Sequence, residues 1–116
     1  MLTTEQITYF ETFGFLVMRQ YFSPEEMDSI TCEFDELIET DRKGKPFDGK
    51  ERQAVADFAE KSPLVMNLIE DDRIYQPIEQ LLGPDFTWAG SDGNLYVGDS
   101  GWHSDDSVPG YDRIKV

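Results

Sequence analysis

Two side chains near the end of the sequence have the types and spacing of metal ligands. His103 is the one histidine among 116 residues, and Asp105 follows two positions later. On an extended strand, residues two apart point to the same face, so this imidazole and carboxylate can converge on one ion. The pair suits a divalent first-row metal and supplies two of the three ligands of a 2-His-1-carboxylate facial triad. The tripeptide alone is more often a histidine in a polar surface loop, so its interpretation depends on the surrounding elements.

The composition limits the partners that such a site can have. With 24 acidic and 10 basic residues, the net charge is -14. A chain this acidic repels phosphate backbones and anionic membrane surfaces, so we expect neither nucleic acid nor membrane as a partner. The single cysteine, Cys32, excludes an intrachain disulfide and a cysteine-based zinc site. The length predicts a single domain, 1–116.

The compartment is predicted from missing signals. The first ten residues, MLTTEQITYF, lack the basic and apolar segments of a signal peptide. No stretch approaches the ~18 apolar residues that a bilayer span requires. We therefore expect a cytoplasmic protein.

The first half of the sequence predicts two capped helices and a strand. Thr3 and Gln6 have capping-box spacing, and Gly14 is expected to end that helix. The apolar run 15–18 predicts a buried strand. Ser23-Pro24-Glu25-Glu26 begins a longer helix that runs to about residue 42, with Cys32 on its solvent side.

The segment 42–52 concentrates positive charge in a predicted loop. Its basic residues are Arg42, Lys43, Lys45, Lys50 and Arg52. A solvated loop is the favoured interpretation. The alternative is a substrate-contacting loop, in which Lys43, Lys45 and Arg52 bind a carboxylate or phosphate.

The second half predicts helices followed by strands. Helices are expected from Gln53 through AVADFAE, after Ser62-Pro63, and from Asp71 or Asp72 to Gly83. A hairpin with Asp92-Gly93 as its turn and a strand beginning over 112–116 are expected after them. Helices first and strands last predict an α+β fold.

Two blocks of the sequence together resemble one enzyme family. The opening LTTEQITYFETFGFLVMRQYFSPEEMDSI predicts a helix, a strand bearing Gly-Phe and a helix that begins Ser-Pro-Glu-Glu. The later block NLYVGDSGWHSDD predicts a strand followed by Trp-His-x-Asp. In order and separation, these blocks are similar to the phytanoyl-CoA dioxygenase family of iron(II)- and 2-oxoglutarate-dependent oxygenases. The resemblance covers nearly the whole chain.

The resemblance implies an oxidoreductase in which His103 and Asp105 hold iron(II) in a double-stranded β-helix core (jelly-roll or cupin-like). It implies a hydroxylase that acts on a small-molecule substrate and converts 2-oxoglutarate to succinate. The carboxylate of Asp105 favours hydroxylation, because related halogenases replace it with a small residue that admits chloride. Asn94 and Tyr96 fall where family members place polar contacts to the cofactor, although placement in the core or in solvent explains them equally well.

The sequence departs from the family after this motif. The family needs a second histidine and a later arginine for 2-oxoglutarate, yet no histidine follows His103, and Arg113 lies too close to the motif. Eight strands also need ~40 strand residues, most of them after the motif. The fold expected is therefore a truncated one, with N-terminal helices leading into the first strands of the core.

Three accounts fit this departure: a fragment of a longer enzyme, which we favour, a shortened relative without catalysis, and a site assembled from two chains. In the first two, the 116-residue chain is inactive by itself. The alternative function is a non-catalytic binding or interaction module derived from the same fold. An unpaired strand edge over 112–116 would favour self-association.

Overall fold

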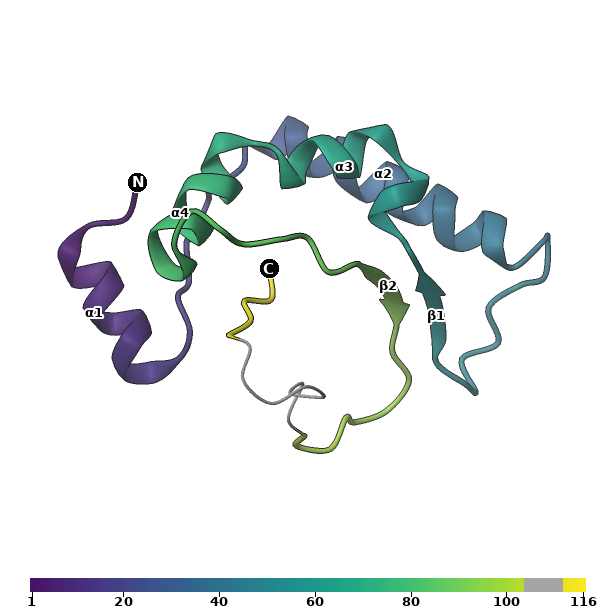
Figure 1. The fold of residues 1–116 in the computed structure, drawn as a ribbon. Coiled ribbons are helices and arrows are strands. Elements are labelled where there is room, and N and C mark those ends of the chain that lie inside the picture. Colours follow the sequence, from purple (N-terminus) through teal and green to yellow (C-terminus); the bar gives the residue numbers. More distant parts are fainter. Residues whose placement is uncertain (104–111) are drawn as a thin grey trace.

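The structure is a computed structural model that describes residues 1–103 and 112–116, so Asp105 and Asp106 lie outside the described residues. The chain is mixed helix and sheet (Figure 1). Its elements in chain order are α1 (Thr4–Phe13), α2 (Pro24–Asp41), β1 (Gln53–Ala56), the 3-10 helix η1 (Ala59–Lys61), α3 (Pro63–Ile69), α4 (Asp72–Leu82) and β2 (Asp92–Leu95).

Helix α1 begins and ends where the sequence predicts. The Thr3 hydroxyl accepts a hydrogen bond from the Gln6 N–H at 3.3 Å, and the Gln6 side chain accepts one from the Thr3 N–H at 2.9 Å. This reciprocal pair satisfies two amides that the first turn leaves without a helical acceptor. At the other end, Gly14 has φ of 78° and donates to the Phe10 carbonyl at 2.7 Å.

Helix α2 is confirmed by the same local chemistry. The Ser23 hydroxyl accepts from the Glu26 N–H at 3.2 Å, Glu26 accepts from the Ser23 N–H at 2.7 Å, and Pro24 occupies the first helical position. Toward its end, Ile38 is buried and Phe34 is half-buried. The thiol of Cys32 is exposed, as predicted.

Helices α3 and α4 also begin at predicted capping residues. The Ser62 hydroxyl accepts from the Val65 N–H at 3.2 Å, and the Asp71 carboxylate accepts from the Arg73 N–H at 2.8 Å. Gly83 ends α4, with its N–H donating to the Glu79 carbonyl. Each cap uses a side chain within three residues of its amide, which is why sequence alone located these helix ends.

The sheet overturns three predictions. The segment 53–60 does not form a helix: Gln53–Ala56 is strand β1, and η1 follows it. Asp92-Gly93 is not a hairpin turn but the start of β2, which pairs antiparallel with β1 so that Val55 lies opposite Gly93. Since β1 lies between α2 and α3, the predicted order of helices before strands is also wrong.

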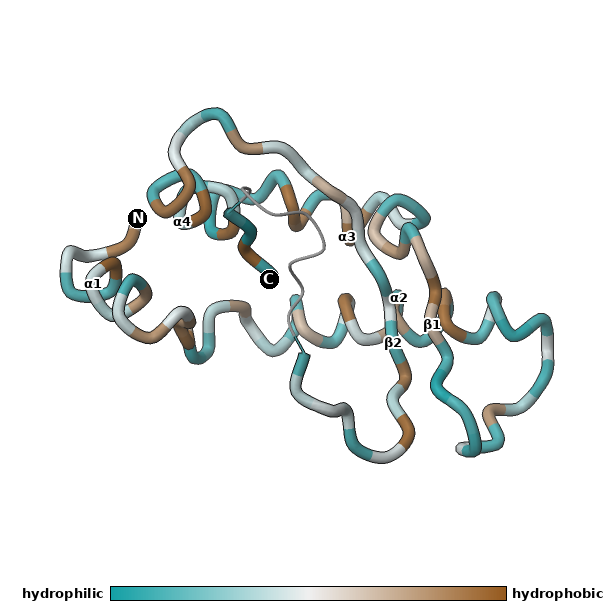
Figure 2. The backbone as a smooth tube through the Cα atoms, turned by 60° about the horizontal axis from the view of Figure 1, so that its bottom comes forward, coloured by the Kyte–Doolittle hydropathy of each residue, from teal (hydrophilic) through white to brown (hydrophobic). Residues whose placement is uncertain are grey.

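The strongest core contacts explain why this segment is a strand. Ile38, Val55 and Phe58 are buried against one another, and Figure 2 shows β1 and β2 side by side across α2. The ring of Phe58 lies 5.1 Å from that of Phe34, centre to centre, and also covers Gly93. Burial of Val55 and Phe58 therefore outweighs the helix propensity of their alanine-rich segment.

Two other expected strands are absent from the described chain. Residues 15–18 form no strand, and Phe15 and Val17 are 52% and 61% exposed. Residues 112–116 form no strand either, so the unpaired edge expected there is wrong. Within the described residues, neither run lies beside a strand that would complete its backbone hydrogen bonds. Self-association of the chain stays a prediction, without the strand edge at 112–116 to support it.

Arg73 joins the beginnings of α2 and α4. Its Nη2 donates to Glu26 at 2.7 Å and to Asp71 at 2.6 Å. Its guanidinium carbon lies 4.6 Å from the centre of the Phe22 ring. The hydrogen bonds from Arg73 lower the pKa of Glu26 to about 2 and that of Asp71 to about 2.

The helices follow an open arc (Figure 1). The radius of gyration is 16.2 Å, against about 13 Å for a compact chain of this length. Among the described residues, no helix combines the length and apolar character that crossing a membrane requires.

Candidate functional site

The outer face of the two-stranded sheet gathers three of the predicted site residues. The register places Gln53 opposite Leu95, so Arg52 and Tyr96 are the next cross-strand neighbours. Because side chains alternate along a strand, Asn94 lies on the same face as Tyr96, and Leu95 points to the core. Arg52 is 42 positions from Asn94 in sequence, so only the strand pairing brings them together.

Arg52 is held over this face by three side chains. Its Nε donates to the Asn94 carbonyl oxygen at 2.9 Å, and its Nη2 donates to the same oxygen at 2.5 Å. Its guanidinium carbon lies 4.7 Å from the centre of the Tyr96 ring, in cation–π geometry. Its Nη2 is also 3.8 Å from the Asp92 carboxylate.

The arrangement is suited to an anion with planar oxygens. A guanidinium has five N–H donors, and Asn94 and Asp92 engage only the Nε and Nη2 side of Arg52. The Arg52 side chain is 47% exposed, so solvent and ligands can reach it. Stacking on Tyr96 fixes the guanidinium plane, which favours bidentate contact with a carboxylate or phosphate. The negative charge of Asp92 opposes that of an incoming anion, so the cluster of Arg52, Asn94 and Tyr96 attracts anions only modestly.

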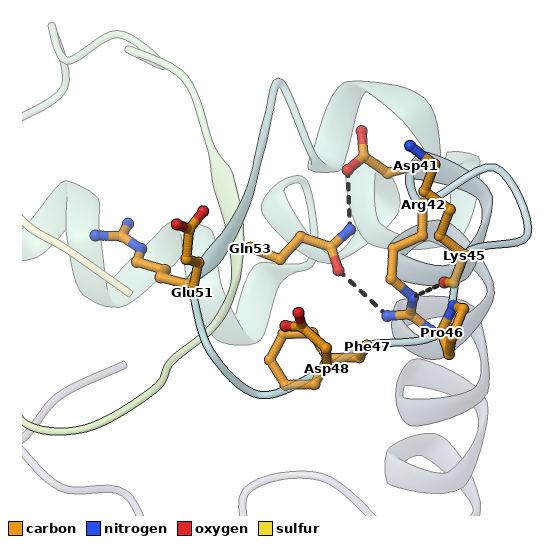
Figure 3. A pocket seen from close by; sticks show the side chains of 9 residues that line it. Asp41, Arg42, Lys45, Pro46, Phe47, Asp48, Glu51 and Gln53 are labelled. Carbon is orange, nitrogen blue, oxygen red and sulfur yellow. Dashed lines mark hydrogen bonds between the residues drawn. The ribbon is translucent and has the colours of Figure 1, made fainter.

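The basic loop forms a shallow pocket of about 270 Å³ (Figure 3), and Arg52 is one of the residues that line it. The Arg42 guanidinium donates to the Lys45 carbonyl at 3.1 Å and to the Gln53 side chain at 3.2 Å. The Gln53 amide donates onward to Asp41 at 2.8 Å. The wall of the pocket comprises Asp41, Arg42, Lys45, Pro46, Phe47, Asp48, Glu51, Arg52 and Gln53.

The lining of the pocket favours neither anionic nor cationic ligands strongly. Its acidic residues balance its basic ones, and Arg42 is engaged by neighbouring oxygens. Of the three cations that the substrate-contacting alternative names, Lys45 and Arg52 share this pocket, whereas Lys43 does not line it. Both Lys43 and Lys45 are exposed.

His103 lies in an irregular segment after β2, not on the strand that would align it with Asp105. Its Nδ1 is 2.8 Å from the Gly101 carbonyl oxygen. Because a carbonyl oxygen only accepts, Nδ1 carries the proton, and in the neutral ring the lone pair is on Nε2. Trp102, the residue before His103, is fully exposed.

The donors present fit an iron(II) site in part. A histidine whose Nδ1–H donates to a backbone carbonyl can bind a metal through Nε2. Metal-bound histidines usually have such a hydrogen-bond partner, which fixes the proton on the other nitrogen and orients the ring. Asp105 lies outside the described residues, and within those residues no three His, Cys, Asp or Glu side chains are close enough to hold a metal. The sequence supplies one histidine, so one copy of this chain offers two ligands of a facial triad.

Asp92 belongs to the same cluster on the outer face of the sheet as Arg52, Asn94 and Tyr96. The sequence predicts it as a turn residue, yet its carboxylate lies 3.8 Å from Arg52 Nη2 and accepts a hydrogen bond from the Asn94 side chain. The alternation Asp92, Asn94, Tyr96 is the signal of one strand face that could have identified it.

The chain was compared with protein-family models, curated proteins and solved structures, and no match was found in any of the three.

Proposed function

We propose that this chain is the part of an iron(II)- and 2-oxoglutarate-dependent dioxygenase that supplies His103 and Asp105 to the metal. The observation that carries the proposal is the Trp-His-x-Asp motif, which follows β2 within eight residues, together with the outer face of the β1–β2 sheet, where Arg52, Asn94 and Tyr96 meet. Iron bound there would supply the oxidative decarboxylation of 2-oxoglutarate that drives hydroxylation of a small organic substrate.

Each residue has a defined task in this proposal. His103 offers Nε2 to the metal while the Gly101 carbonyl orients the ring. Asp105 offers a carboxylate oxygen. Arg52 binds an oxyanion of the co-substrate or substrate, Asn94 holds the guanidinium from one side, and Tyr96 holds its plane.

Anaerobic calorimetry with iron(II) tests the metal ligands. We expect His103→Ala and Asp105→Ala each to weaken iron(II) binding by the chain at least tenfold, because each removes one direct ligand. Asp99→Asn removes a nearby exposed carboxylate outside the motif and is the matched control. Equal affinity in the wild type and both ligand variants would overturn the proposal.

A second titration, with 2-oxoglutarate itself, tests the anion site. Arg52→Gln keeps a polar side chain but removes the charge, so affinity is expected to fall about tenfold, the size of one charge-assisted hydrogen bond. Lys50→Gln removes a charge from the same loop at an exposed position and is expected to leave affinity unchanged. An effect of equal size in both variants would indicate long-range attraction instead of a site.

The alternative function, a non-catalytic binding module, is favoured by one observation: the sequence holds a single histidine. The two functions differ in turnover. If the purified chain forms succinate from 2-oxoglutarate in a reaction that requires iron(II) and stops on chelation, the binding module is excluded. An iron(II) affinity that rises in the presence of 2-oxoglutarate would point to a site assembled between chains.

A further inference from the structure

Glu60 forms two hydrogen bonds with the segment that leads into β2. Its carboxylate accepts a hydrogen bond from the Trp88 indole N–H at 2.7 Å and one from the Ser91 hydroxyl at 2.5 Å. These donors are 28 and 31 positions away in sequence. Both are neutral and Glu60 is charged, so each bond is of the stronger, charge-assisted kind.

Two further hydrogen bonds hold Ser91, one from the residue after β1 and one from η1. Its hydroxyl oxygen accepts from the Ala59 N–H at 2.8 Å, and its carbonyl accepts from the Asp57 N–H at 2.9 Å. Ser91 is the residue directly before β2 begins at Asp92. The position of its backbone therefore decides which residue of β2 meets which residue of β1.

The backbone pairing of the two strands specifies their register weakly, so side-chain contacts such as that of the Phe58 ring with Gly93 must add to it. The sheet has two strands, and β2 pairs through four residues, one of which is the side-chain-free Gly93. Short, glycine-containing pairings are prone to slip, and a slip of one residue turns every side chain to the opposite face. Asn94 would then point toward the core and leave Arg52.

We propose that Glu60 is a positioning residue: by holding Ser91 and Trp88 it sets the register of β2 on β1 and so assembles the Arg52–Asn94–Tyr96 cluster. Glu60 touches none of those three side chains and acts through the strand. The proposal concerns the geometry of the sheet and goes beyond the proposed dioxygenase function, since its test uses no metal and no ligand.

The charge of Glu60 supports this role. The hydrogen bonds from Ser91 and Trp88, with the backbone and Lys61 adding to them, lower the pKa of the Glu60 carboxyl. Glutamine in its place has one acceptor oxygen where the carboxylate has two. Glu60→Gln therefore matches the shape of the side chain but leaves one of the two donors without its acceptor.

The cross-strand register is the decisive measurement, because a merely stabilising residue would leave it unchanged in folded protein. We expect NMR cross-peaks between Ala54 and Asn94 in the wild type. In Glu60→Gln, at a temperature where far-ultraviolet circular dichroism shows the helices intact, these cross-peaks should weaken or be replaced by those of a shifted pairing. Glu70→Gln, an exposed glutamate at the end of α3, is the matched control.

Trp88 provides an independent readout. In a Trp102→Phe background it is the sole tryptophan, because the sequence has two. Its emission should change with pH as Glu60 titrates, and this change should be absent in Glu60→Gln. If Glu60→Gln unfolds, Ser91→Ala, which removes a single hydroxyl, is expected to give the same loss of cross-peaks. An unchanged register in the folded variants would overturn the proposal.

Discussion

Gly93 is required by one side chain, the ring of Phe58. A methyl group built on Gly93 would overlap that ring, 2.7 Å from its Cγ, and Phe58 is itself buried between Ile38 and Val55. Gly93 is not among the glycines with positive φ. The constraint at this position is therefore space, not backbone conformation.

The variant Gly93→Ala is accordingly expected to destabilise the chain by about 1–3 kcal/mol, the usual cost of overpacking a core. Urea unfolding followed by circular dichroism measures this change. Gly101→Ala is the control, since a methyl group there meets nothing within 4 Å. Equal midpoints for the two variants would show that the Phe58 ring moves aside freely.

At the same scale, Arg52 shows what a sequence can and cannot reveal about a site. The residues Arg52, Asn94 and Tyr96 were all predicted as contacts, but from separate arguments and for different ligands. The structure places them in one cluster because β1 pairs with β2. No local pattern encodes a contact across 42 positions.

Among the elements, the helix caps are the most local features and the most testable. Ser23→Ala removes the hydroxyl that accepts from the Glu26 N–H and is expected to lower the free energy of unfolding by about 1 kcal/mol. Ser29→Ala, inside α2, removes a hydroxyl that donates to the Glu25 carbonyl. Because alanine is the better helix former, that control should be neutral or stabilising. A larger loss at residue 29 than at residue 23 would contradict the capping role.

The junction between α2 and α4 predicts a dependence on acid. Arg73 lowers the pKa of Glu26 and of Asp71 to about 2 each, from ordinary values of 4.5 and 3.8. The unfolded chain therefore takes up protons first as pH falls, and the stability from this junction, complete above pH 4.5, decreases as pH falls toward 2.

Thermal unfolding at a series of pH values checks this sign. Between pH 4.5 and 2 the wild type should lose more stability than Arg73→Met, which lacks the guanidinium hydrogen bonds that are the largest cause of both lowered pKa values. Lys115→Met, outside the junction, should follow the wild type. An identical pH profile for wild type and Arg73→Met would show that the junction contributes no pH-dependent stability.

At the scale of the whole molecule, charge repulsion opposes compactness. The chain carries a net charge of -14, and its described residues form an arc with five buried hydrophobic side chains. Exposed ion pairs are worth at most about 1 kcal/mol each and weaken in salt. Repulsion among the excess carboxylates is also screened by salt, and it acts over the entire surface.

Sodium chloride is therefore expected to raise the unfolding temperature at neutral pH, because the relief of repulsion outweighs the weakening of a few surface pairs. Differential scanning calorimetry at low and high salt measures the change. Sucrose at equal osmolality is the control for excluded-solute effects. A lower unfolding temperature in salt would mean that the ion pairs around Arg52 and Arg73 dominate.

Features whose physical causes lie within a few residues can be predicted from the sequence. The starts of α1, α2, α3 and α4 follow from side chains that bond amides two or three positions away, and the exposure of Cys32 follows from helical periodicity. The motif at His103 and the acidic composition are likewise properties of the chain alone.

The sheet and the grouping of the site residues depend instead on contacts between segments that are distant in the sequence. The alanine-rich segment after Gln53 favours a helix locally, but Val55 and Phe58 gain more by burial against Ile38. Asp92-Gly93 favours a turn locally, but the Phe58 ring requires a residue without a side chain at Gly93. The energy of packing between distant segments exceeds local propensity at both places, and that energy is not written in any short stretch of sequence.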